Sequence, residues 1–298
     1  MQGWIDGLAR AWLEAPGLPP VDFTQPPGEE ALAGPRSVSW RVFKNPVALF
    51  VGGVAAVILE LAEPRVRMGV WEHSSFRSDP VQRLQRTGLA AMVTVYGARS
   101  VAERMIAGVV RRHDAVAGTA PGGEAYHAGD PALLAWVHAT AAFGFAEAYH
   151  RYARPLGRED FDRFYAEGGP AARLYGAVDA PASGAELHAL FAAMRGRLEP
   201  SPIVFEFLDI MRAAPVFPAP LRPVQRVLIR AAVETVPDWV RERLGLTPAH
   251  GLHGRGLRGW EPLVRRLGSL SDRVVLRSGP AAQSCLRLGL PADHLYRA

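Results

Sequence analysis

Apolar residues along most of this chain recur at the three- and four-residue spacing of amphipathic helices, whereas the alternation typical of strands is sparse. Polar residues that can cap a helix stand before these runs, often followed by proline, and glycine ends several of them. The pattern predicts helices over residues 46–59, 80–96, 100–117, 131–152, 158–175, 184–198, 202–214 and 223–236, with shorter ones near 237–244 and 257–268. The sequence therefore predicts an all-α fold.

Two segments interrupt the helical pattern. The glycine-rich stretch "GTAPGGEAYHAG", residues 118–129, is typical of a small β-hairpin, and Gly118 is expected to end the helix before it. The stretch "APVFPAPLRP", residues 214–223, indicates a proline-rich bend rather than a domain boundary. Because no internal repeat or low-complexity linker is visible either, we expect a single domain.

The most apolar stretch covers residues 45–64, and its uncharged part runs only from Pro46 to Leu59. A membrane span needs about 20 apolar residues, so a buried core helix with Asn45 as N-cap is the better interpretation. The N-terminal segment contains Asp6 and Glu14 and lacks the basic start of a secretion signal. We therefore expect no transmembrane span and a cytoplasmic protein.

Composition narrows the classes of function. The chain has 298 residues, 49% of them hydrophobic, and a formal net charge of +5. Its basic residues are arginines apart from Lys44, and they are scattered rather than gathered in a run interleaved with aromatic residues. This distribution argues against nucleic-acid binding. Cys285 is the only cysteine, which excludes an intramolecular disulfide and a zinc site built on several cysteines and suits a reducing compartment.

His113 is the first candidate for chemistry, because it falls on the apolar face of the helix predicted over residues 100–117. That face also carries Ile106, Val109, Val110, Val116 and Ala117. Arg111 and Arg112 precede His113, and Asp114 points away by about 100°. His138 lies similarly on a stripe with Leu134, Phe145 and Tyr149. Each histidine is either a hydrogen-bonded core residue or a ligand to a bound group.

Arg83 and Thr87 are a second candidate, because they stand one helical turn apart in the segment 80–96. A guanidinium and a hydroxyl at this spacing can bind an anionic group and polarise a ligand. The alternative is a solvent-facing arginine with an incidental threonine, and the spacing alone favours that alternative.

The dipeptide His113-Asp114 also matches HD-type metal phosphohydrolases, which are all-helical. Such an enzyme needs a further upstream histidine and a downstream aspartate, for which His73 and Asp130 are available. A dipeptide is a weak match. No glycine-rich phosphate loop and no Gly-x-Ser-x-Gly elbow is present.

Four further segments are informative when they are taken in order: "SWRVFKNP", "SSFRSDPVQRLQRT", "YGARSVAERMIAGVVRRHDAVAGTAPGGEAYHAGDPALLAWVHAT" and "AYHRYARPLGREDFDRFYAE". Together they resemble one known family, that of the fungal MpaB oxygenase and the bacterial rubber oxygenase, also called latex clearing protein. The specificity lies in the ordered set: Arg-x-x-x-Thr, His-x-x-Val-x-Gly, Gly-x-x-Tyr, Asp-Pro and Trp-Val-His. On this basis we divide the chain into an N-terminal extension (1–36), the family domain (37–245) and a C-terminal helical extension packed on it (246–298).

The resemblance implies a globin-like helical fold with a pocket for haem b, in which His113 matches the proximal iron ligand. Arg83 and Thr87 match a pair near the haem, Arg111 or Arg112 could pair with its propionates, and His138 would lie near the His113 helix. Characterised members cleave carbon–carbon double bonds of isoprenoid chains with dioxygen. The expected partners are thus dioxygen and a small lipophilic substrate.

This chain departs from the rubber oxygenases at Arg86, where they carry a lysine that can cap the iron. An arginine cannot, because it stays protonated. With no secretion signal visible, polyisoprene is a poor candidate substrate. The leading hypothesis is a haem-dependent oxygenase. The alternatives are a non-catalytic haem- or lipid-binding protein of the same fold and the HD-type hydrolase.

Overall fold

The structure, a computed structural model, describes Gly7, residues 17–254 and residues 259–297. Helices dominate these residues, which confirms the predicted mainly α-helical class. The helices are α2 (Val38–Phe43), α3 (Pro46–Glu60), α4 (Pro64–Glu72), α5 (Pro80–Tyr96), α6 (Arg99–His113), α7 (Pro131–Tyr152), α8 (Arg158–Tyr175), α9 (Gly184–Met194), α10 (Pro202–Ala213), α11 (Arg222–Thr235), α12 (Asp238–Leu244), α13 (Trp260–Ser271) and α14 (Pro280–Arg287). Short 3₁₀ turns, η1 (Ala219–Leu221) and η2 (His294–Tyr296), complete them.

The helix starts follow one local rule. Asn45, Asp79, Asp130 and Ser201 each accept a hydrogen bond from a backbone N–H of the first turn, and a proline follows each of them. The side chain satisfies a donor that the helix leaves free, and proline has no N–H to satisfy. These four predicted helix starts are confirmed.

The predicted hairpin is present, but the helix before it is shorter than predicted. Strands β1 (Ala117–Thr119) and β2 (Ala125–His127) pair antiparallel, with Gly118 opposite Tyr126. Helix α6 ends at His113, so the prediction of a helix to residue 117 was wrong. The backbone carbonyl of Val116 accepts a hydrogen bond from the Ala128 N–H, so the hairpin takes over the chain beyond His113.

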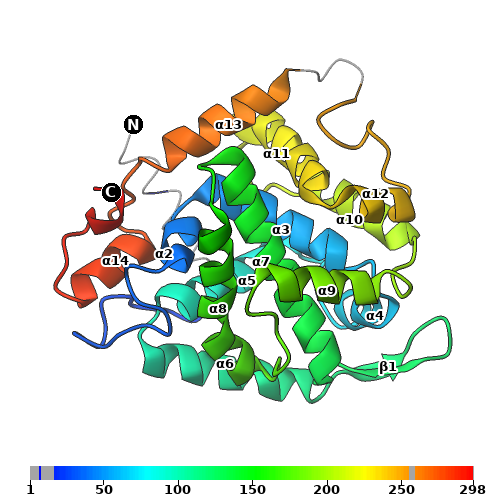
Figure 1. Ribbon diagram of the computed structural model, residues 1–298, viewed down its shortest axis with the longest axis horizontal. Helices are drawn as coiled ribbons and strands as arrows, with labels where there is room; N and C mark the ends of the chain where they lie inside the picture. Colours follow the sequence, from blue (N-terminus) through cyan, green and yellow to red (C-terminus); the bar gives the residue numbers. More distant parts are fainter. Residues whose placement is uncertain (1–6, 8–16, 255–258, 298) are drawn as a thin grey trace.

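Helices α3 and α7 run through the middle of the molecule and pack closely (Figure 1). Their contact depends on glycine: a Cβ at Gly52 would lie 2.7 Å from the Gly144 carbonyl oxygen. Two glycines therefore let the helix backbones touch. Helices α11 and α13 cover one side of this pair, and α6 lies along the opposite edge of the molecule with the hairpin projecting beside it (Figure 1).

The C-terminal helices are tied to the rest by buried polar contacts. The Asn45 amide donates to the Gly268 carbonyl oxygen at 2.9 Å, and Lys44 forms an ion pair with Asp272 at 3.4 Å. On α14, the Ser284 hydroxyl donates to the Tyr96 carbonyl oxygen at 2.7 Å. Helices α13 and α14 thus pack directly on α3, α7 and α5.

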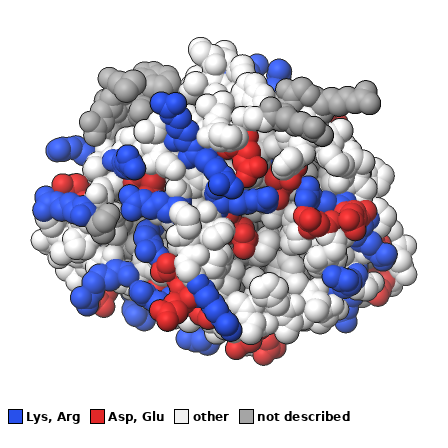
Figure 2. Space-filling view, turned by 45° about the horizontal axis from the view of Figure 1, so that its top comes forward, with Lys and Arg blue, Asp and Glu red and all other residues white. Residues whose placement is uncertain are grey.

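Two sequence predictions extend beyond the described residues. Residues 1–6 and 8–16 of the N-terminal extension lie outside them, as do residues 257 and 258 at the start of the helix predicted over 257–268. No single described helix is long and apolar enough to cross a membrane, and α3 with α4 would reach that length only as a pair bent by 114°. On the face in Figure 2, basic side chains are spread widely and acidic side chains lie between several of them.

Candidate functional site

His113 is the last residue of α6, and its imidazole has no hydrogen-bond partner among the described residues. Its Nδ1 atom is buried, and the side chain as a whole keeps partial exposure. Burial, and then the positive charge of Arg83, lower the pKa of His113 below its ordinary value of 6.5. The imidazole is therefore neutral near pH 7, which is the form that binds a metal.

Arg83 and Thr87, which the sequence places one turn apart on α5, are in direct contact. The Arg83 guanidinium donates to the Thr87 hydroxyl oxygen, and that hydroxyl donates to the Arg83 carbonyl oxygen at 2.9 Å. The guanidinium also lies 5.4 Å from the centroid of the Phe76 ring. Because the positive charge of Arg83 also lowers the pKa of His113, the three residues that the sequence singled out are linked by contact or by charge.

Glu60 joins this group, although the sequence pattern did not single it out. It is the last residue of α3, and its carboxyl makes no hydrogen bond or ion pair with the described residues. Burial raises the pKa of Glu60 to about 7, against the opposing charge of Arg83. A signal was available: Glu60 is the first charged residue after the uncharged stretch 46–59.

We call Glu60, Arg83, Thr87 and His113 the Arg83 cluster. Its residues lie at the C-terminal ends of α3 and α6 and in the first half of α5. Three of its side chains are desolvated enough to shift their pKa values, yet none of the four is fully buried. This combination is typical of groups that line a ligand site, where protein surrounds a side chain but a small molecule still reaches it.

His138 lies apart from this cluster. Burial lowers the pKa of His138 to about 4, and no hydrogen bond to its ring is present among the described residues. Its ring edge faces α8, where a Cβ at Gly168 would lie 3.1 Å from Nε2. Helix α8 also packs against α6, so His138 and His113 each sit on a helix that contacts α8. No contact joins the two rings.

Arg111 and Arg112, in the last turn of α6, are exposed. Neither forms an ion pair with the described residues. Their guanidinium groups are thus available to an anionic group outside the protein.

The residues that an HD-type hydrolase requires are not assembled. The His73 Nε2 lies 3.2 Å from the Tyr126 hydroxyl, and Asp130 caps α7 by accepting from the Ala132 N–H at 2.8 Å. Within the described parts of the chain, no group of three His, Cys, Asp or Glu side chains could hold a metal ion. The geometry gives no support to a bare divalent metal at His113 and Asp114.

The fold and the Arg83 cluster define a class: a helical protein that offers a neutral, unengaged imidazole beside an arginine, a threonine and a protonatable carboxyl. The family model described as ER-bound oxygenase mpaB/B'/rubber oxygenase, catalytic domain, matches residues 40–266, and the chain belongs to this family. The suspected family is thereby confirmed, and the match runs further towards the C-terminus than residue 245. No curated protein and no solved structure matches the chain.

Proposed function

We propose that this protein is a haem b-dependent oxygenase that acts on a small lipophilic, isoprenoid-like unsaturated molecule, with His113 as the axial ligand of the iron. The observation that carries the proposal is made on His113, in a chain of an oxygenase family: its imidazole is neutral and has no hydrogen-bond partner among the described residues. A buried polar group without a partner is costly unless a ligand completes it.

The residues around His113 fit a haem. Val109 and Val110 of α6 are partly exposed apolar side chains that suit a porphyrin face. Arg111 and Arg112, which have no acidic partner among the described residues, would pair with the propionates. When bound, the haem iron would supply the activation of dioxygen.

The rest of the Arg83 cluster would serve the reaction through hydrogen bonds and a proton. Arg83 would donate to an oxygen atom of a bound ligand or to a propionate, and Thr87 would position the guanidinium for it. Glu60, with a pKa of about 7, can hold or release a proton at its carboxyl near neutral pH. His138 would position α7 against α8 rather than bind the iron.

The test is turnover by protein supplemented with haem b. A short isoprenoid alkene should be consumed with dioxygen and yield carbonyl products, measured by oxygen uptake and mass spectrometry. Thr87→Val should lower the rate at least about tenfold, whereas Thr119→Val, on the exposed strand β1, should leave it unchanged.

Other results would select an alternative. Haem binding without oxygen uptake on any isoprenoid alkene would favour a non-catalytic haem- or lipid-binding protein. Phosphoesterase activity with a divalent metal that is lost in Asp114→Ala would favour the HD-type hydrolase. Because Cys285 is buried and alone, we also propose that the protein works in the reducing cytoplasm.

A further inference from the structure

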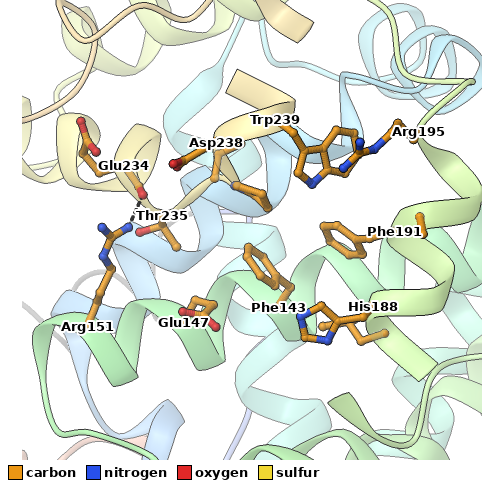
Figure 3. Close-up of a pocket in the computed structure, with 14 residues that line it drawn as sticks. Phe143, Glu147, Arg151, His188, Phe191, Arg195, Glu234, Thr235, Asp238 and Trp239 are labelled. Carbon is orange, nitrogen blue, oxygen red and sulfur yellow. Dashed lines mark hydrogen bonds between the residues drawn. The ribbon is translucent and has the colours of Figure 1, made fainter. Parts of the chain in front are cut away.

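A second candidate site lies beside the face of α7 that carries Phe143 and Glu147. A hollow of about 470 Å³ opens between α7, α9 and the junction of α11 with α12 (Figure 3). Phe143, Leu187, Phe191 and Trp239 form apolar parts of its wall, and the Phe143 and Phe191 rings lie 5.1 Å apart. Its size and aromatic lining are those of a small-molecule site.

Glu147 faces this hollow without a counter-ion. Arg151 stands one turn further along α7, where it could pair with Glu147, but its guanidinium donates to the Glu234 carbonyl oxygen instead (Figure 3). The Glu147 carboxyl makes no hydrogen bond or ion pair with any described residue, and burial raises its pKa. The Glu147 carboxyl is thus a partly buried group without a hydrogen-bond or ion-pair partner among the described residues, which is costly unless a ligand completes it.

His188 adds a second free acceptor. Its Nδ1 lies 2.6 Å from the Gly184 carbonyl oxygen, which can only accept, so Nδ1 carries the proton. In the neutral imidazole the other ring nitrogen, Nε2, is then an acceptor, and no described residue donates to it. Glu147 on α7 and His188 on α9 thus each offer a free acceptor to the hollow, and together they suit a ligand that carries several donors.

The other charged groups at the hollow are already engaged. Arg195 lies over the Trp239 ring at 4.7 Å on the exposed side. Asp238 and Glu234 both pair with Arg241, at 2.5 Å and 3.1 Å. Among the acidic side chains of the wall, Glu147 thus remains the one for which the described residues provide no partner.

We propose that this hollow binds a primary ammonium compound with an apolar body, whose ammonium group donates to Glu147 and His188 while its body packs on Phe143 and Phe191. A primary ammonium has three donors and no acceptor, which matches the free atoms of the wall. The site shares no residue with the Arg83 cluster. Glu147 and His138, nine residues apart on α7, point about 180° away from each other. The inference is therefore independent of haem binding.

Isothermal titration calorimetry with three probes of similar shape tests the proposal on the full-length protein. The probes are 2-phenylethylammonium, neutral 2-phenylethanol and anionic 3-phenylpropionate. The ammonium should bind at least about tenfold more tightly than the alcohol, and the carboxylate should be the weakest. Glu147→Gln should lower the affinity for the ammonium at least about tenfold, whereas Glu242→Gln, on the exposed face of α12 outside the hollow, should not change it.

Three results would overturn the proposal: no binding of the ammonium at millimolar concentration, tighter binding of 3-phenylpropionate, or unchanged affinity in Glu147→Gln. The carboxylate probe tests the opposite charge preference, because Arg151 and Arg195 also line the hollow. The probe comparison uses the unaltered chain, so it decides the question even if a variant folds poorly. Thermal unfolding checks the variants, and Glu147→Gln should be at least as stable as the unaltered protein because it removes an unpaired buried charge.

Discussion

Glu60 shows how position alone can set the charge of a side chain. An exposed glutamate is ionised at neutral pH, but burial at the end of α3 raises the pKa of Glu60 to about 7 even though Arg83 opposes the shift. Between its ordinary value of 4.5 and about 7, the folded chain holds a proton at Glu60 that the unfolded chain has released. The folded state therefore loses stability as the pH rises through this range and loses no more above it.

Glu60→Gln removes this dependence. In protein without haem, the free energy of unfolding of the variant relative to the unaltered chain should rise between pH 5 and pH 8 by about 1–3 kcal/mol. Urea unfolding at intervals of pH measures it, with Glu103→Gln on the exposed face of α6 as the control. Parallel pH profiles for the unaltered chain and Glu60→Gln would show that Glu60 titrates as an ordinary surface carboxyl.

The sequence identified only some of the residues of the Arg83 cluster. Arg83 and Thr87 are one turn apart on a single helix, so their contact follows from helical periodicity. Glu60 reaches them from another helix, and its approach depends on how the chain turns between α3 and α5. Local spacing carries no information on that turn. Glu147 was missed for the same reason, because the hollow beside it needs α9 and α12.

Among the helical elements, the sequence predicted those that begin with Asn, Asp or Ser followed by a proline. It missed α2, α4 and α14, which span only 6, 9 and 8 residues and so show few turns of an apolar period; α4 was missed although Glu63 and Pro64 mark its start. It extended α6 to residue 117 because Val116 and Ala117 continue the apolar face of that helix. The partner that draws this segment into a hairpin, β2, lies outside the helical window.

The packing of α3 on α7 gives a prediction at this scale. Gly52→Ala should destabilise the protein by about 1–3 kcal/mol or more, because the new Cβ would lie 2.7 Å from the Gly144 carbonyl oxygen and the helices would have to separate. Gly53→Ala is the matched control: its Cβ would meet the Phe145 ring at 3.8 Å, an ordinary contact, and alanine favours the helix by up to about 1 kcal/mol. Thermal unfolding compares them, and equal stability of the two variants would contradict the close approach.

At the scale of the whole molecule, Asp272 ties the C-terminal part to the family domain. Its carboxylate has no exposed surface and contacts Lys44 at 3.4 Å, the Tyr149 hydroxyl at 3.3 Å and Arg154 at 2.8 Å. Burial lowers the pKa of Lys44, whereas the charge of Asp272 favours its protonated form. Each of these two buried charges is therefore stabilised by the other.

Asp272→Ala should cost about 3–5 kcal/mol of unfolding free energy, because Lys44 would stay buried without its counter-ion. Glu261→Gln, which removes a more exposed ion pair with Arg265 on the same helix, should cost less than about 1 kcal/mol. Urea unfolding of both variants gives the comparison. If Asp272→Ala were as mild as Glu261→Gln, the C-terminal helices would not depend on this contact.

One spectroscopic titration decides whether His113 binds the iron of haem b. The unaltered protein should bind about one equivalent of haem b and develop a Soret band, whereas His113→Ala should not do so at the same haem concentration while its helical circular dichroism persists. Added imidazole should restore the band in the variant, because a small ligand can occupy the space that the side chain leaves. If His113→Ala developed a Soret band without imidazole, at the intensity of the unaltered protein, His113 would not be the ligand that holds the iron.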